Sequence, residues 1–191
     1  PFLLEVLRLN QDGKLSVNEV LSIFLITENY LFRRNICEVP PNSLNKIFVN
    51  LNREILRYDN TADNYVKKFI YALLSKKDSG RFPDDAEFTK ALATKQVYQM
   101  RGRYKVYLFE RFENYGTIET KDVYTHLDNN IYTIEHIMPQ HLNPAWLETL
   151  GTNATEIHAT WLHRLANLTL TGFNPALSNN TFSEKRDAKE G

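Results

Sequence analysis

Apolar side chains recur at helical spacing through the first part of the chain, and this pattern limits the fold to a mainly helical one. Leu21 and Leu25 follow the pattern, and Pro40 ends it. Ser16 and Glu19, three residues apart, are typical of a capping box at the start of a helix. We expect further helices over four later stretches, at 42–55, at 65–74, from Asp84 onward, and at 103–112.

The pattern changes at Asn114-Tyr115-Gly116, a combination typical of a helix end followed by a turn. Short β-branched stretches follow, and we expect strands at 117–120, 131–134 and 168–171. A helix is expected after Pro175, through Lys189, and Trp146 and Trp161 are expected as core anchors. We therefore predict a helical domain over residues 1–115 and a small α+β unit over residues 116–191.

The charge balance constrains any role in nucleic-acid binding. The chain has 23 basic and 23 acidic residues, whereas a dedicated nucleic-acid-binding protein usually carries a basic excess. From Ile131 onward, six acidic side chains stand against four basic ones. Any affinity for a nucleic acid would therefore have to come from elsewhere in the chain. The candidate cations are Arg33 with Arg34, Lys67 with Lys68, and the group of Arg101, Arg103 and Lys105.

Other features of the chain restrict its class. The single cysteine, Cys37, excludes an internal disulfide and fits a reducing compartment. No apolar run is long enough to span a membrane, and the N-terminus does not have the pattern of a signal peptide. Because the chain begins without Met and inside an apolar run, we expect it to be a fragment of a longer protein.

The segment from Asn10 to Glu19 resembles part of an EF-hand calcium loop, with Gly13 at its sixth position. Arg8, however, stands at the first position, where calcium requires a carboxylate. A turn followed by the Ser16 capping box explains the same residues without a metal ion. We therefore favour the turn and cap over the calcium site.

The stretch 134–140 is the most informative for chemistry, because it holds Glu135 and His136. Hydrolysis of a phosphodiester needs a base near neutral pH, which an imidazole provides. It also needs a divalent cation to neutralise charge on a phosphate oxygen and on the leaving group. Hard cations such as Mg²⁺ prefer oxygen ligands, and Glu135 and Asn174 offer them. These residue types predict a single-metal hydrolytic site.

Zinc is the alternative metal. His136, His141, His158 and His163 form two pairs, each with four intervening residues. A structural zinc site without cysteine would need all four histidines, which is an uncommon set, and the spacing differs from that of His-Glu-x-x-His metalloproteases. We therefore favour the oxygen-bound cation, with His163 as a second histidine that assists beside the strand after Asn167.

The order of these residues resembles that of the HNH, or His-Me finger, nucleases. The resemblance rests on Glu135-His136 with Pro139, on Asn167-Leu168, and on Asn174 ahead of the final helix. It implies a ββα-metal fold for the C-terminal unit, in a chain that is otherwise mainly α.

The same resemblance implies roles for individual residues. His136 becomes the general base, Glu135 and Asn174 the metal ligands, and Asn167 the brace of the loop that carries His136. Asn179 is an alternative to Asn174, because the sequence does not fix the register after Phe173. Near the end of the chain, Lys185 and Arg186 are expected either to contact a phosphate or to complement the C-terminus of their helix.

A closer resemblance is to the C-terminal domain of GmrSD-type restriction enzymes, the modification-dependent family that defends prokaryotes against phage. It rests on Glu-His-Ile-x-Pro-Gln from Glu135, on Asn-Leu-Thr-Leu from Asn167, and on the Glu-Lys-Arg ending at Arg186. It extends to stretches 30–37 and 81–88 in the helical part. Two departures are Ala166, where the family usually has Gly, and Glu135, where many HNH enzymes have Asp.

This resemblance implies a metal-dependent DNA endonuclease with one Mg²⁺ or Mn²⁺ ion per site, in the prokaryotic cytoplasm. Its substrate would be DNA, including base-modified phage DNA, and a homodimer is compatible with it. In the family, a ParB-like nucleotide-hydrolysing domain with an Asp/Glu-Gly-Gln-Gln-Arg signature comes first; the sequence lacks this signature, in agreement with a fragment. The alternative is a non-catalytic module, with a helical scaffold and a small unit that binds DNA without cutting it.

Overall fold

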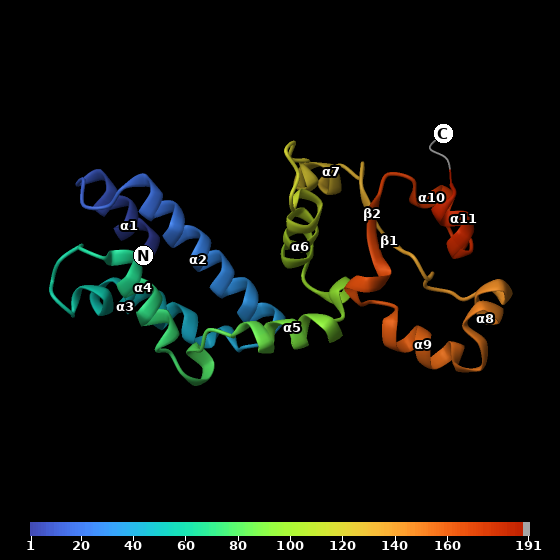
Figure 1. Cartoon of the computed structure of the whole chain (residues 1–191), viewed down its shortest axis with the longest axis horizontal. Helices are drawn as coiled ribbons and strands as arrows, with labels where there is room; N and C mark the ends of the chain where they lie inside the picture. The colour runs from blue at the N-terminus through green and yellow to red at the C-terminus, as the bar shows by residue number, and fades with distance from the viewer. Residues whose placement is uncertain (189–191) are drawn as a thin grey trace. The chain divides into compact units, whose positions relative to one another are not determined.

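The computed structural model describes residues 1–188, and within them the side chains of Asn174 and Ala176 lie outside the description. The described chain is mainly helical and contains a small two-stranded antiparallel sheet. It divides into two compact units, Pro1–Leu92 and Ala93–Gly191 (Figure 1). The expected fold class, mainly α with a small α+β part near the C-terminus, is confirmed at this level, and the ββα-metal arrangement stays a prediction.

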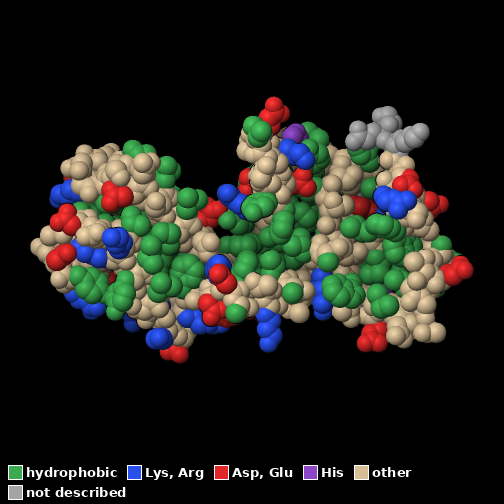
Figure 2. Space-filling view, viewed as in Figure 1, with side chains coloured by type: hydrophobic (Ala, Val, Ile, Leu, Met, Phe, Trp, Pro, Cys, Tyr) green, Lys and Arg blue, Asp and Glu red, His purple; other side chains and the backbone are tan. Residues whose placement is uncertain are grey.

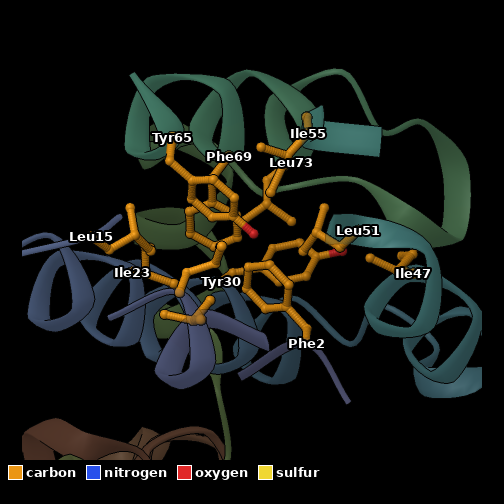
Figure 3. Close-up of a cluster of buried hydrophobic side chains, with 13 residues drawn as sticks. Phe2, Leu15, Ile23, Tyr30, Ile47, Leu51, Ile55, Tyr65, Phe69 and Leu73 are labelled. Atoms are coloured by element: carbon orange, nitrogen blue, oxygen red, sulfur yellow. The ribbon is translucent and has the colours of Figure 1, made fainter. Parts of the chain in front are cut away.

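The first unit consists of helices joined by short turns. Its elements are α1 (Phe2–Gln11), α2 (Val17–Ile36), η1 (Pro41–Ser43), α3 (Leu44–Leu56), α4 (Tyr65–Leu74) and η2 (Asp78–Gly80), and α5 (Asp85–Thr94) begins in it. α1 packs against α2 and α3, and α4 packs against α2 and α3. Figure 3 shows the side chains that these helices bury between them.

Aromatic and aliphatic side chains fill this core. Phe2 stacks on Phe69 with the ring centroids 5.2 Å apart, which joins α1 to α4. Ile47, Leu51 and Ile55 line the buried face of α3, as their helical spacing predicts. The spacing of apolar residues therefore identified both the helices and the faces that they bury.

The Ser16 capping box is confirmed at the start of α2. The Ser16 side chain accepts a hydrogen bond from the backbone of Glu19, and the Glu19 carboxylate accepts one from the backbone of Ser16. The side chain of Asn10 donates to the carbonyl oxygen of Leu15, and Gly13 has the positive φ of a tight turn. The residues that resemble an EF-hand loop therefore form the turn and the helix cap.

The second unit contains shorter elements. They are η3 (Val97–Gln99), α6 (Gly102–Asn114), α7 (Val123–Asp128), β1 (Thr133–His136), α8 (Pro144–Leu150), η4 (Gly151–Asn153), α9 (Ala154–Trp161), η5 (Leu165–Asn167), β2 (Leu168–Thr171), α10 (Asn174–Leu177) and α11 (Phe182–Arg186). β1 and β2 pair antiparallel, with Glu135 opposite Thr169 and His136 opposite Leu168. Figure 1 shows α10 and α11 following β2 within this unit.

Four local predictions for this unit were wrong or only partly right. Stretch 117–120 forms no strand, because no neighbouring segment pairs with it among the described residues. The strand expected at 131–134 begins instead at Thr133 and ends at His136. The expected C-terminal helix is interrupted between α10 and α11, and Ser178 there has a positive φ of 40°. Trp146 is buried as expected, but Trp161 is 43% exposed.

The division after Leu92 differs from the boundary expected after residue 115, because α6 packs against α7 and belongs to the second unit. Whether the functional boundary follows residue 115 stays a prediction. Lys and Arg side chains are interspersed with Asp and Glu side chains on the face shown in Figure 2, as the zero net charge suggests. Within residues 1–188, no helix has the length and apolar content needed to cross a membrane.

Candidate functional site

Glu135 and His136 occupy the last two positions of β1. Successive side chains of a strand point to opposite faces, so the two side chains diverge where the strand ends. Both residues are nevertheless buried. The pairing continues past the strand through a 2.9 Å hydrogen bond from the Ile137 amide to the carbonyl oxygen of Asn167. The backbone that carries His136 is therefore fixed on both sides.

Asn167 braces the segment that follows His136. Its side-chain oxygen accepts a hydrogen bond of 2.7 Å from the Met138 amide, and its side-chain nitrogen donates to the carbonyl oxygens of Met138 and Leu162. Asn167 is buried, and its two bonds to Met138 satisfy buried backbone groups. This geometry matches the bracing role expected from the sequence.

Lys185 on α11 forms a buried ion pair with Glu135. Its Nζ lies 2.5 Å from Glu135 Oε1 and donates to the carbonyl oxygen of His136 at 2.9 Å. The side chains of Lys185 and Glu135 are each only 7% exposed. Lys185 and Arg186 were expected either to contact a phosphate or to complement the C-terminus of their helix. Of these two residues, Lys185 lies inside the site. Arg186 is exposed and pairs with Asp187.

The imidazole of His136 lies among other rings. Its Nε2 is 3.3 Å from Nδ1 of His163, and the ring of Tyr98 contacts it edge-on at 4.4 Å between centroids. Tyr98 also stacks on His163, and its backbone amide donates to the His163 carbonyl oxygen. His163, expected to assist at the site from beside the Asn167 strand, thus lies next to the His136 ring, and its role stays a prediction.

Burial, above all, lowers the pKa of His136 to about 4. The same lowering of the pKa includes smaller contributions from four neighbouring groups that carry or can acquire positive charge: His163, Lys185, His158 and Lys105. Burial also lowers the pKa of His163, and His158 adds to this effect. Both imidazoles are therefore neutral at pH 7, and each ring has one nitrogen able to accept a proton.

A cavity of about 310 Å³ opens at the end of β1. Glu135 and His136 line it together with Pro139, Ser178 and Asn179. Asn179 belongs to the turn between α10 and α11, which brings this residue to the site from the end of the chain. Of the two asparagines considered as the second ligand, Asn179 lines the cavity, and the side chain of Asn174 lies outside the description.

Trp146 of α8 and Asn143, which precedes this helix, hold the turn that carries Asn179. Asn143 caps α8 through its side-chain oxygen, and its side-chain nitrogen donates to the carbonyl oxygen of Asn179 at 2.9 Å. The indole nitrogen of Trp146 donates to the carbonyl oxygen of Asn180 at 3.0 Å. The sequence does not indicate this role, because Asn143-Pro144 has only the pattern of an ordinary helix start.

The three expected cations Arg101, Arg103 and Lys105 differ in their exposure. Lys105 is half-buried; its Nζ donates to the carbonyl oxygen of Tyr98 at 2.7 Å and lies over the Tyr98 ring. Burial lowers the pKa of Lys105. Arg101 and Arg103 are exposed. Lys105 thus lies beside the ring that contacts His136, and only the two arginines of this group lie on the open surface.

The described residues contain no group of three or more His, Cys, Asp or Glu side chains that could hold a metal ion. The four-histidine zinc site is not assembled: His158 donates from Nε2 to the carbonyl oxygen of Pro139, and His136 pairs with His163. Glu135 and Asn179 remain a minimal oxygen donor set for Mg²⁺, which keeps water and phosphate as most of its ligands.

A neutral imidazole, a carboxylate and a carboxamide around one small polar cavity define a candidate hydrolytic site. Residues 82–190 match the model of a protein family, the C-terminal domain of GmrSD restriction endonucleases. The chain therefore belongs to this family, which indicates a nuclease role related to restriction, with DNA as the substrate of the family. The match includes every residue of the site and begins after stretch 30–37, which lies outside it.

No curated protein and no solved structure shows significant similarity to the chain.

Proposed function

We propose that the chain is a metal-dependent DNA endonuclease of the HNH type, in which His136 is the general base. The position and protonation state of His136 carry this proposal. The residue ends β1 at a polar cavity, and its pKa of about 4 keeps the imidazole neutral at pH 7. An approaching phosphate is anionic, so it raises this pKa and makes the ring a better proton acceptor when substrate is present.

Glu135 and Asn179 are the residues that we propose as ligands of one Mg²⁺ or Mn²⁺ ion. Lys185 donates a hydrogen bond to Oε1 of Glu135, so we propose that Oε2 is the oxygen that binds the ion. Asn179 lines the cavity and is the second ligand that we propose, and Asn174, whose side chain lies outside the described residues, stays the alternative. When bound, such an ion would neutralise charge on the phosphate and on the departing oxygen.

Other residues of the chain have supporting roles in this proposal. Asn167 keeps the backbone after His136 in place, so that the imidazole faces the cavity. His163 lies within reach of Nε2 of His136 and can take up or return a proton there. Tyr98 packs against both rings and limits the access of water. By family resemblance, we expect products with 5′-phosphate and 3′-hydroxyl ends.

Manganese soaked into crystals of the full chain tests the metal site. We expect anomalous density between Glu135 and Asn179, and the loss of this density in Glu135→Gln. A full-strength peak in Glu135→Gln, or no peak in the unaltered chain, would contradict the proposal. An empty site would favour the alternative, a non-catalytic module that binds DNA without cutting it.

Membership of the GmrSD family supports two broader proposals. We propose that base-modified phage DNA is the preferred substrate, and that a ParB-like domain and a second copy of the chain take part in the active assembly. Cleavage of modified and unmodified phage DNA, measured with and without such a domain, tests both. Equal cleavage of the two DNAs by the complete assembly would contradict the preference.

A further inference from the structure

Positive charge is concentrated on α3, α4 and the residues just after α4. Residues 44–77 carry seven cations and three acids, in a chain whose net charge is zero. The cations are Lys46, Arg53, Arg57, Lys67, Lys68, Lys76 and Lys77, and the acids are Glu54, Asp59 and Asp63. α3 and α4 pack against each other, so these charges share one region of the first unit. Such an excess favours an anionic partner.

A cleft of about 930 Å³ lies in this region, lined by residues that include Asn52, Arg53, Arg57 and Lys76. Arg53 and Arg57 are four residues apart, so they lie on the same face, one helical turn from each other. Both are exposed, and no carboxylate within residues 1–188 forms an ion pair with either one. Two guanidinium groups are therefore available at the cleft.

The surroundings hold these cations in place. Arg53 donates to the side-chain oxygen of Asn50 at 2.6 Å. The guanidinium of Arg57 lies 5.7 Å from the ring centroid of Tyr58, and Tyr58 packs edge-on against Tyr71. Side chains that are already positioned lose less entropy when they bind a ligand. This distinguishes the cleft from a surface of freely moving lysines.

The remaining lining is also suited to an anion. Glu54 is the acidic residue that lines the cleft, and it forms an ion pair with Lys76. The side-chain oxygen of Asn52 accepts a hydrogen bond of 2.6 Å from the hydroxyl of Tyr65, so its amide nitrogen is the group left for a ligand. The cleft therefore offers hydrogen-bond donors and cations to a ligand, with its carboxylate already neutralised.

We propose that this cleft binds the phosphate backbone of DNA. Guanidinium groups suit phosphate oxygens, and a backbone contact needs no base-specific geometry. The cleft would supply the DNA affinity that the acidic segment from Ile131 onward does not offer. The choice of DNA as the ligand rests on the proposed function, whereas the preference for phosphate rests on the cleft alone.

Fluorescence anisotropy with the full chain and a labelled DNA duplex tests the proposal. EDTA is present throughout, so a failure of the nuclease proposal leaves the binding measurement intact. Arg53→Ala with Arg57→Ala is expected to raise Kd about tenfold at about 0.1 M salt, and to reduce the slope of log Kd against log salt by about 2. Both arginines are exposed, so thermal unfolding should be unchanged.

Arg8→Ala with Lys14→Ala is the matched control, because it removes two exposed cations of the same unit outside the cleft lining. We expect this control to keep Kd within about twofold. Equal losses in the two double variants would overturn the proposal, because they would show a general charge effect. No loss in the cleft variant would also overturn it. A third result would overturn the proposal as well: the cleft variant loses binding of a nucleoside triphosphate but keeps its affinity for DNA.

Discussion

The indole nitrogen of Trp146 donates a 3.0 Å hydrogen bond to the carbonyl oxygen of Asn180, which ties α8 to the turn between α10 and α11. Asn143 adds a second bond to the carbonyl oxygen of Asn179. The turn itself is not part of a helix or strand. We infer that α8 sets the distance between Asn179 and Glu135.

Trp146→Phe removes the donor and keeps most of the ring. We expect about 1 kcal/mol of lost stability, and a severalfold rise in the Mn²⁺ concentration needed for half-maximal DNA cleavage. Titration of cleavage activity with Mn²⁺ measures this. Trp161→Phe is the control, because Trp161 is 43% exposed on α9. The same Mn²⁺ requirement in the two variants would rule out a positioning role for Trp146.

Asn167→Ala leaves two buried backbone groups of Met138 and the half-buried carbonyl oxygen of Leu162 without this partner. We expect a loss of about 2–6 kcal/mol in the free energy of unfolding, because each of the two unsatisfied buried groups costs about 1–3 kcal/mol. Urea unfolding measures it. Asn129→Ala, at an exposed position of the same unit, should change stability by less than about 0.5 kcal/mol. Similar values for the two variants would contradict the bracing role.

Lys185→Met removes the charge that pairs with Glu135 but keeps a side chain of similar length. The metal-free protein should lose about 3–5 kcal/mol, because a buried carboxylate is left without its partner. Mn²⁺ should then raise the melting temperature more than it does in the unaltered chain, because Lys185 no longer competes for Glu135. Thermal unfolding with and without Mn²⁺ measures the difference. Arg186→Met is the exposed control, and an equal Mn²⁺ effect in all three proteins would contradict the competition.

The low pKa of His136 predicts a pH dependence of stability in EDTA. An unfolded histidine titrates near its ordinary value of 6.5, whereas folded His136 titrates at about 4. Between these values the unfolded chain binds more protons, so stability is lost as pH falls from about 6.5 to about 4. The shift corresponds to about 2–3 kcal/mol.

Urea unfolding at several pH values measures this loss. His136→Gln should flatten the dependence, and His126→Gln, on α7, should keep it. Identical curves for His136→Gln and the unaltered chain would show that another group is responsible.

The sequence predicted the parts of the fold that depend on near neighbours. The Ser16 capping box, the buried face of α3 and the span of α4 follow from spacing within one helix, so local patterns were sufficient. Stretch 117–120 has the β-branched composition of a strand, but a strand also needs a partner, which only the tertiary fold supplies.

The candidate site was predictable in its chemistry but not in its geometry. Glu135, His136 and Asn167 were singled out by type and order. The ion pair between Lys185 and Glu135 joins positions 50 residues apart, and no local pattern indicates it. The same holds for Tyr98 against His136 and for Trp146 against Asn180, because these contacts depend on how separate segments pack.

Cleavage of supercoiled plasmid DNA by the full protein, in Mg²⁺ or Mn²⁺, tests the central claim most directly. His136→Gln should lower the rate at least about a hundredfold, because general-base catalysis contributes about 10²–10⁴-fold. His126→Gln should cleave at the rate of the unaltered protein. Full metal-dependent cleavage by His136→Gln would contradict the account, because the buried imidazole at the end of β1 would then not be the base.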